Sequence, residues 1–235
     1  MITNKKILIT GASSGLGRSL ANILLERNNK IYSLSRSKIF NKKIKSQICN
    51  FKSILDIKKK LNKLILKKID YVFLNAGILG DIKKIEKINS KELLEILKIN
   101  FIANKEIIDF IIKKKIKPKL IVGISSGAAL KPKYGWDLYT SSKSAFKFLL
   151  DSYAEEHPDY SFINISPGLI KTKMQDQIYK VDEKKIKSVK KFKIANKNNM
   201  IPTADVVAKT IIQYIEKNKK IKNSYIDLKK LIKII

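Results

Sequence analysis

The chain contains very little of several residue types, and each scarcity excludes something. Its 235 residues include a single cysteine, Cys49, so no intramolecular disulfide can form, and a lone thiol suits a reducing compartment. No apolar run approaches the roughly 18 residues that a membrane-spanning helix needs. The first ten residues, MITNKKILIT, contain no apolar signal region with a small-residue cleavage site. We therefore expect a soluble, cytoplasmic protein without a membrane partner.

Arginine is also scarce, although the chain is strongly basic. The formal net charge is +30, yet only three of the 50 basic residues are arginines: Arg18, Arg27 and Arg36. Recognition of phosphates and bases favours the planar guanidinium group, and the lysines are spread along the chain rather than gathered in one stripe. Lys, Ile and Asn are abundant together, which an A/T-rich genome explains. We therefore expect no specific nucleic-acid partner, only weak and salt-sensitive binding to polyanions.

Short apolar runs alternate with longer stretches that have helical spacing. The runs predict strands at 6–10, 30–35, 44–50, 69–75, 119–125, 160–166 and 223–228. The stretches between them predict helices at 15–28, 53–67, 91–115, 139–156 and 203–218. This alternation predicts an α/β fold: one domain over residues 1–235 with a doubly wound parallel sheet of about seven strands and helices on both faces. The Lys-rich segment 171–200 has little strand signal, and we expect either a substrate lid or a solvated helix pair.

A glycine-rich turn follows the first predicted strand and opens the first helix. In ITGASSGLGRSLA (9–21), Gly11, Gly15 and Gly17 have the spacing G-x-x-x-G-x-G. Glycines there let the backbone approach a pyrophosphate, while the helix N-terminus offers N–H groups and a partial positive charge. The position at the start of an alternating β/α chain predicts dinucleotide binding.

The end of the second predicted strand bears on which dinucleotide binds. An acidic residue there would bind the ribose of NAD, but the sequence has Ser35 and Arg36. The Arg36 guanidinium could pair with a 2′-phosphate and the serine hydroxyl could add a hydrogen bond. This favours NADP(H), and NAD(H) stays open.

A tyrosine followed four residues later by a lysine occurs twice, as Tyr139–Lys143 and Tyr225–Lys229. With 47 Lys among 235 residues, nine Tyr should give about two such pairs by chance. The pair alone therefore carries no information, and its surroundings must decide its meaning.

The surroundings of the first pair resemble the short-chain dehydrogenase/reductase family over essentially the whole chain. The resemblance rests on the glycine-rich turn, on NAG at 75–77, on KIN ending at Asn100, on Ser126 thirteen residues before Tyr139, and on SPGLIKTKM at 166–174. It implies a Rossmann-type domain with the catalytic set Asn100, Ser126, Tyr139 and Lys143. On this basis Tyr139–Lys143 is the catalytic pair and Tyr225–Lys229 a chance match.

The family implies a role for each catalytic residue. Tyr139 would donate the proton in carbonyl reduction, and Ser126 would orient the carbonyl. Lys143 would bind the nicotinamide ribose, and Asn100 would hold a water in a proton relay. Because residues i and i+4 share a helix face, we expect the Lys143 ammonium to lower the pKa of Tyr139.

The resemblance also implies cofactor contacts along the chain, with two departures from the family pattern. Asn50 stands where the family usually has Asp, and positions 12–14 are Ala-Ser-Ser without the basic residue of many NADP-preferring members. The expected cofactor contacts are Gly11, Ser13, Ser14, Gly15, Leu16, Gly17, Ser35, Arg36, Asn50, Asn75, Ala76, Gly77, Tyr139, Lys143, Pro167, Gly168, Ile170 and Thr172.

The Gly-Trp sequence three residues before Tyr139 is similar to the sepiapterin reductase and benzil reductase branch. This implies an NADPH-dependent carbonyl reductase acting on a ketone or diketone, with substrate contacts from Ser126, Tyr134, Trp136, Tyr139 and Met174. The alternatives are an alcohol or sugar dehydrogenase of the same family and a non-catalytic dinucleotide-binding sensor, although such sensors usually lack the Tyr or Lys. The family also implies a homodimer or homotetramer. No metal is expected.

Overall fold

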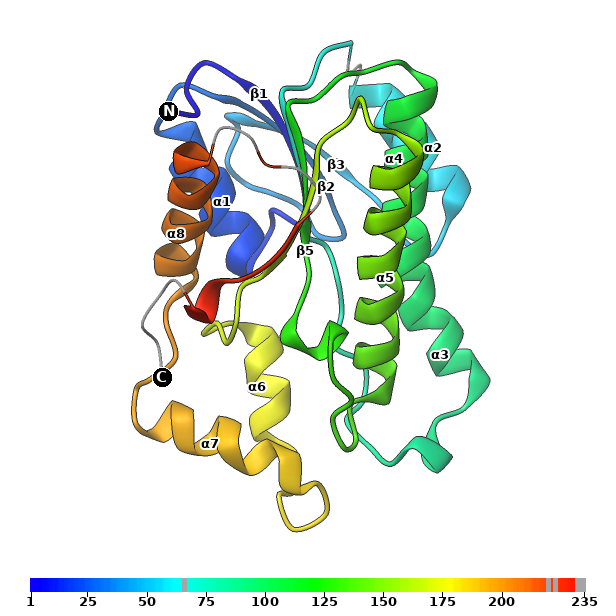
Figure 1. Cartoon of the computed structure of the whole chain (residues 1–235), viewed down its shortest axis with the longest axis vertical. Helices are drawn as coiled ribbons and strands as arrows, with labels where there is room; N and C mark the ends of the chain where they lie inside the picture. The colour runs from blue at the N-terminus through cyan, green and yellow to red at the C-terminus, as the bar shows by residue number, and fades with distance from the viewer. Residues whose placement is uncertain (65–66, 219–220, 222–223, 231–235) are drawn as a thin grey trace.

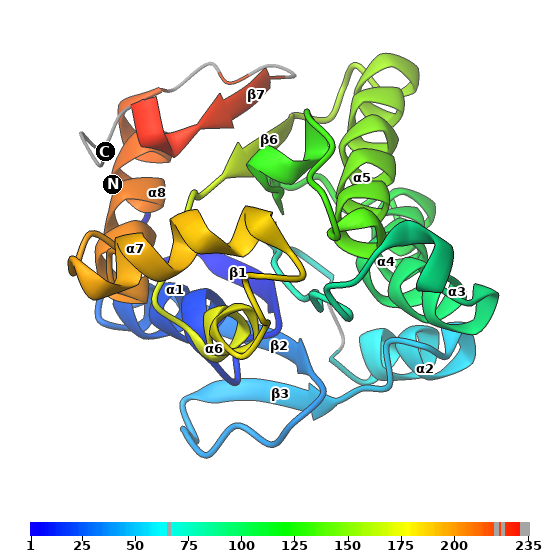
Figure 2. The same cartoon turned by 90° about the horizontal axis from the view of Figure 1, so that it is seen from below.

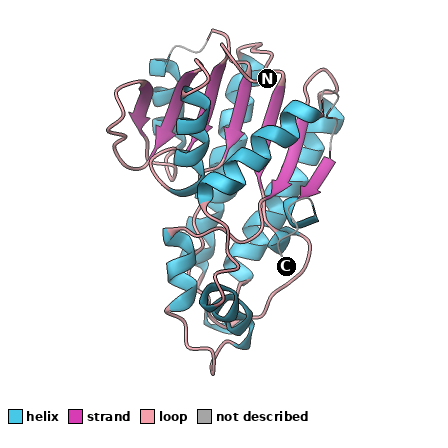
Figure 3. Cartoon of the chain, turned by 90° about the vertical axis from the view of Figure 1, so that its left-hand side faces the viewer, coloured by secondary structure: helices cyan, strands magenta, loops and turns pink. Residues whose placement is uncertain are grey.

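A single parallel sheet forms the centre of the molecule. The computed structural model describes residues 1–64, 67–218, 221 and 224–230. Within these residues the sheet has seven strands in the order β3-β2-β1-β4-β5-β6-β7 (Figure 3). This confirms the predicted doubly wound α/β fold and all seven predicted strands. The strands are β1 (Lys6–Thr10), β2 (Lys30–Ser35), β3 (Ile44–Ile48), β4 (Tyr71–Leu74), β5 (Leu120–Ile124), β6 (Phe162–Ser166) and β7 (Ser224–Asp227).

Helices cover both faces of the sheet (Figure 1). On one face lie α1 (Gly15–Leu25) and α8 (Ala204–Lys217), whose apolar sides form one core cluster with the strands. On the other face α2 (Ile54–Leu64), α4 (Ala103–Lys113) and α5 (Asp137–Glu156) form the second cluster. None of the helices in the described part of the chain combines the length and apolar character needed to cross a membrane.

The predicted helix at 91–115 is interrupted. The structure has α3 (Ser90–Leu97), a π-helical turn over Lys98–Ile102, and then α4. The side chain of Asn100 lies in this wider turn and is fully buried. Asn100 accepts a hydrogen bond from the Ile78 N–H (2.8 Å) and donates one to the Ile78 carbonyl (2.8 Å). The turn thus places a polar side chain against the loop that follows β4, in keeping with the frequent occurrence of π-turns at functional sites.

The segment 171–200 lies beyond the carboxyl ends of the strands (Figure 2). It contains α6 (Lys173–Tyr179) and α7 (Lys190–Lys197). Ile178, Ile186 and Val189 are buried there against Trp136. The segment therefore packs against Trp136 through these three side chains, although α7 has no fully buried residue, and its role as a lid stays a prediction. The strand order reverses between β1 and β4, and a ligand crevice is expected at such a point of an open α/β sheet.

Candidate active site

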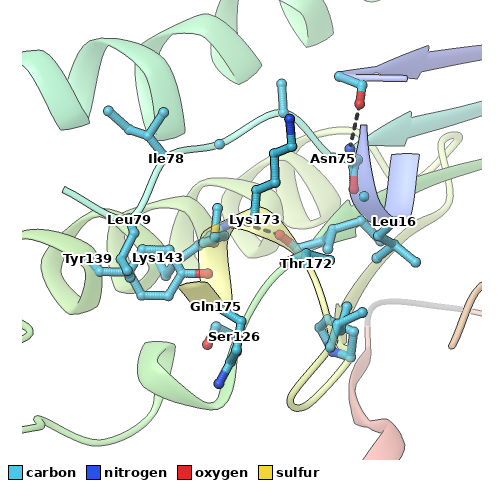
Figure 4. A pocket seen from close by; sticks show the side chains of 18 of the residues that line it. Leu16, Asn75, Ile78, Leu79, Ser126, Tyr139, Lys143, Thr172, Lys173 and Gln175 are labelled. Carbon is cyan, nitrogen blue, oxygen red and sulfur yellow. Dashed lines mark hydrogen bonds between the residues drawn. The ribbon is translucent and has the colours of Figure 1, made fainter. Parts of the chain in front are cut away.

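A cavity of about 1020 Å³ lies at the carboxyl edge of the sheet, where the strand order reverses (Figure 4). It extends from the glycine-rich turn, across the ends of the central strands, to α5 and the segment 171–200. Most of the expected site residues line it: Gly11, Ser13, Ser14, Gly15, Leu16, Arg36, Asn50, Asn75, Ala76, Gly77, Ser126, Trp136, Tyr139, Lys143, Pro167, Gly168, Ile170, Thr172 and Met174. Four others, Gly17, Ser35, Asn100 and Tyr134, do not.

The glycine-rich turn has a shape that suits a pyrophosphate. Gly11 and Gly15 have positive φ angles of 74° and 53°, which favour glycine. A Cβ atom on Gly17 would lie 2.4 Å from the Gly11 carbonyl oxygen, so Gly17 allows the helix to pack on the turn instead of lining the cavity. The first N–H groups of a helix have no partner within it, and the Ser14 side chain makes no capping hydrogen bond at the start of α1. These N–H groups are available to an anion, as a dinucleotide requires.

Asn75 holds this turn against the end of β4. Its side-chain amide donates to the Thr10 carbonyl (2.9 Å), and the Thr10 hydroxyl accepts from the backbone N–H groups of Asn75 and Ala76 (2.9 Å each). The two strand ends that border the crevice are thus fixed to one another. Asn75 therefore shapes the cavity and also lines it.

At the far end of the cavity, the structure separates the two residues expected to recognise the 2′-phosphate. Arg36 is exposed and lines the cavity. Ser35 is 1% exposed, and its hydroxyl lies 3.0 Å from that of Ser33. Ser37 and Lys38 line the cavity instead. Ser35 is the last residue of β2 and is buried, whereas Arg36, Ser37 and Lys38 follow the strand and are exposed at its end.

Ser126, Tyr139 and Lys143 come together from β5 and α5. Ser126 follows β5, and its Oγ accepts a hydrogen bond from the Ala128 N–H (3.1 Å). Tyr139 and Lys143 are one turn apart on α5, with the Lys143 Nζ 5.8 Å from the Tyr139 ring centroid. The Lys143 ammonium donates to the Ile124 carbonyl at 2.7 Å. Three of the four expected catalytic residues therefore share one end of the cavity.

The expectation that Lys143 lowers the pKa of Tyr139 does not hold in this structure. Burial of its hydroxyl raises the pKa of Tyr139 to about 12, and hydrogen bonding to Ser126 opposes this only in part. Burial lowers the pKa of Lys143 to about 8. The loss of hydration disfavours the charged form of both groups and outweighs their proximity. Tyr139 is thus held as a phenol, the form that donates a proton.

Asn100 lies behind the cavity wall. Its side-chain amide is occupied by Ile78 and by the Ser142 hydroxyl (2.9 Å). A Cβ on Gly77 would lie 3.2 Å from the Asn100 Oδ1 and 3.7 Å from the Lys143 Nζ, so Gly77 lies between the two. Asn100 therefore supports the loop next to Lys143, and the water-relay role stays a prediction.

Tyr225 is the most informative residue that the sequence reasoning missed. Tyr225 and Lys229 do not share a helix face, because Tyr225 is in β7. Its hydroxyl nevertheless donates a hydrogen bond to the Ser126 carbonyl at 2.9 Å. Tyr225 and Lys229 are therefore no catalytic pair on one helix, but Tyr225 contacts a residue of the expected site. Its place near the end of a predicted parallel strand could have indicated this, since strand ends meet at one edge of the sheet.

The substrate side of the cavity is aromatic and partly basic. Trp136 is buried, contacts Tyr139 edge-on (6.5 Å between centroids) and stacks on Phe192 of α7 (4.9 Å). Tyr134 is 54% exposed and contributes only its carbonyl, which accepts from Ser188. Helical periodicity in the segment 171–200 could not show which of its side chains face the cavity. Those that do are Thr172, Lys173, Met174, Gln175, Ile178, Ser188, Lys191 and Phe192.

Comparisons with known proteins agree with this geometry. Residues 5–183 match the model of a family described as short chain dehydrogenase. Benzil reductase ((S)-benzoin forming) of Bacillus subtilis (strain 168) is 27% identical over 226 residues, which cover 89% of this chain and 93% of that protein. The crystal structure of KRED1-Pglu enzyme has a TM-score of 0.86 at 23% identity, covering 94% of this chain and 100% of that one.

A short chain dehydrogenases/reductase from Saccharomyces cerevisiae also has a TM-score of 0.86, at 22% identity, over 98% of this chain and 99% of its own. The two structural likenesses show the fold, and the family model spans most of the chain. The protein therefore belongs to the short chain dehydrogenase family and is an NAD(P)(H)-dependent oxidoreductase.

Proposed function

We propose that this protein is an NADPH-dependent carbonyl reductase that converts a ketone or diketone, of benzil-like or sepiapterin-like shape, to an alcohol. The observation that carries the proposal is the convergence of Ser126, Tyr139 and Lys143 at one end of a cavity whose other end is a glycine-rich, anion-binding turn. The benzil reductase of Bacillus subtilis, at 27% identity, supports the same reaction class.

The three side chains divide the chemistry of carbonyl reduction. When bound, the cofactor supplies a hydride that passes to the carbonyl carbon. Tyr139 gives its phenol proton to the carbonyl oxygen, so the products are an alcohol and the oxidised cofactor. Ser126 orients the carbonyl, and Lys143 stabilises the phenolate that Tyr139 becomes.

Tyr139 would serve either direction of the reaction, since the phenol donates the proton in reduction and the phenolate accepts it in oxidation. Burial raises the pKa of this group to about 12, so the phenol predominates near neutral pH. The alternative of an alcohol or sugar dehydrogenase therefore stays open.

Arg36 supports NADPH over NADH as the cofactor. It lines the cavity together with Lys38, and both are exposed cations next to the end of β2. Solved structures of the same fold contain NADH or NADPH, so the fold accommodates either. The preference in this chain would come from pairing of the guanidinium with the 2′-phosphate.

We further expect a homodimer or homotetramer formed through α4 and α5. Phe146 is fully buried in the core and does not serve this purpose, but Phe148 on α5 is 66% exposed. An exposed phenylalanine on a long helix indicates a contact surface. Light scattering at micromolar concentration and moderate salt should give a mass above that of one 26.9 kDa chain.

Replacement of Tyr139 by Phe tests the proposed reaction. The change removes one hydroxyl, so the rate of NADPH oxidation with a diketone should fall by about 100-fold or more. NADPH affinity, measured by fluorescence titration, should stay near that of the wild type. Near wild-type turnover by the Tyr139→Phe protein with any substrate would refute the assignment.

A further inference from the structure

Lys133 is a cation in the cavity that the proposed reaction does not use. It precedes α5, and its ammonium lies 5.4 Å from the ring centroids of both Trp136 and Phe192. Trp136 in turn contacts Tyr139 at 6.5 Å. Lys133 therefore lies on the substrate side of the cavity, one aromatic ring away from the proton donor.

A second lysine, Lys229, lines the same cavity. Lys229 follows β7, and its stem packs on Gly168, where a Cβ would lie 3.0 Å from the Lys229 Cγ. Both lysines line the cavity. Burial is the main cause that lowers the pKa of Lys133, and the charge of Lys229 adds to it. Lys229 is exposed and Lys133 is partly buried, and an anion bound beside both would favour the charged form of Lys133.

The protein itself offers these cations little compensation. In the described part of the chain, no carboxylate forms an ion pair with Lys133 or Lys229. Two acidic residues line the cavity. Glu95 pairs with Lys52 (2.7 Å) near the other end, and Asp227 accepts a hydrogen bond from the Lys229 backbone N–H (3.1 Å).

Lys133 is partly buried in the cavity, between aromatic rings. Burial lowers the pKa of Lys133 and of Lys143, and both line this cavity. Lys143 is accounted for by the proposed reaction. Perturbed ionisable groups in a cleft are typical of functional sites.

We propose that the ketone substrate carries an anionic group, a carboxylate or a phosphate, which Lys133 binds with Lys229 beside it while the apolar part of the substrate contacts Trp136 and Phe192. This inference rests on the proposed carbonyl reduction and specifies its substrate class. It makes Lys133 a specificity-determining residue that distinguishes charged ketones from neutral ones such as benzil.

The test compares pairs of related ketones in which one member carries an anionic group and the other is neutral. Benzoylformate and its methyl ester form one pair, 3-benzoylpropionate and its methyl ester form a second with a longer spacing, and dihydroxyacetone phosphate and dihydroxyacetone form a third. We expect wild type to prefer the charged member of at least one pair. A preference limited to the third pair would identify a phosphate, and one limited to the first two a carboxylate.

Lys133→Gln should lower kcat/KM for the preferred anion by about tenfold. This factor corresponds to the lower end of the free-energy range for a charge-assisted hydrogen bond, because the site is half-exposed. Its neutral partner and the KM for NADPH should be unchanged. The matched control is Lys131→Gln, which removes an equal charge from an exposed residue that does not line the cavity. It should leave both members of the pair unchanged.

Other outcomes would overturn the inference in distinguishable ways. If wild type reduces neutral ketones at least as well as charged ones and Lys133→Gln changes neither, the proposed reductase stands and the anion site is refuted. If Lys133→Gln impairs both members of a pair equally, Lys133 only supports the aromatic wall. If wild type reduces no ketone at all, the proposed function itself fails.

Discussion

Lys143 should impose an alkaline limit on cofactor use, because its charge is lost close to physiological pH. Burial lowers the pKa of this side chain to about 8, whereas Tyr139 has a pKa of about 12 and stays protonated over the whole range. The charged fraction of Lys143 should therefore fall from about 90% at pH 7 to about 10% at pH 9. If the ammonium is needed to hold the nicotinamide ribose and to stabilise the phenolate, activity should fall with it, by about tenfold over these two pH units.

The suitable measurement is kcat/KM for NADPH at saturating ketone, because this quantity reports groups that titrate in the free enzyme. Circular dichroism over the same pH range would check that the fold is retained. Lys143→Met removes the cation at every pH, so its residual activity should be low and independent of pH between 7 and 9. In the Tyr139→Phe protein, the affinity for NADPH should still decrease between pH 7 and 9, because Lys143 and not Tyr139 titrates in this range.

A profile that is flat from pH 7 to 9.5 in the wild type would refute this reasoning. A decrease in activity near pH 8 that persists in Lys143→Met would also refute it, since another group would then be titrating. If the decrease with pH disappears in Tyr139→Phe, the titrating group is Tyr139 instead of Lys143. Its hydroxyl would then ionise far more easily than its burial implies.

Two further predictions concern residues at opposite ends of the cavity. Arg36→Gln should raise the KM for NADPH by about tenfold to a hundredfold and leave the KM for NADH unchanged. Because Lys38 could compensate in part, the comparison should be repeated in added salt, which screens exposed charge. Equal loss of both cofactors would exclude recognition of the phosphate by Arg36. Tyr225→Phe should lower kcat by about two- to tenfold through displacement of Ser126, with the KM for NADPH unchanged, and an unaltered kcat would leave its hydrogen bond without a functional role.

The sheet could be predicted because each of its strands corresponds to a short apolar run, which is a local feature of the sequence. Strands buried on both faces are short apolar runs, and all seven were recognisable in a chain whose other segments are rich in lysine. The interruption of the predicted helix at 91–115 could not be foreseen, because a π-turn adds one residue per turn and hardly disturbs the apolar spacing. The polar residue buried in that turn, Asn100, was found only through the family resemblance.

The candidate site was predicted where it depends on order along the chain and missed where it depends on distant contacts. The spacing of Ser126, Tyr139 and Lys143 can be read directly. The contact of Tyr225 with Ser126 spans 99 residues, and no local pattern contains it. The wrong sign of the expected Tyr139 pKa shift has the same origin, because helical spacing gives proximity to Lys143 but not the burial that outweighs it.

In this protein the burial of a lysine, rather than its mere presence, indicates a functional role. With 47 lysines in the chain, the presence of one in any cavity is unremarkable in statistical terms, and most of them are solvated and screened. Removing water from an ammonium is costly, so a chain with many surface positions for lysine has no need to bury one unless a partner or a reaction compensates. Lys143 has the Ile124 carbonyl and the proposed phenolate. Lys133 has aromatic faces and no carboxylate partner among the described residues, and an anionic substrate would supply what its surroundings lack.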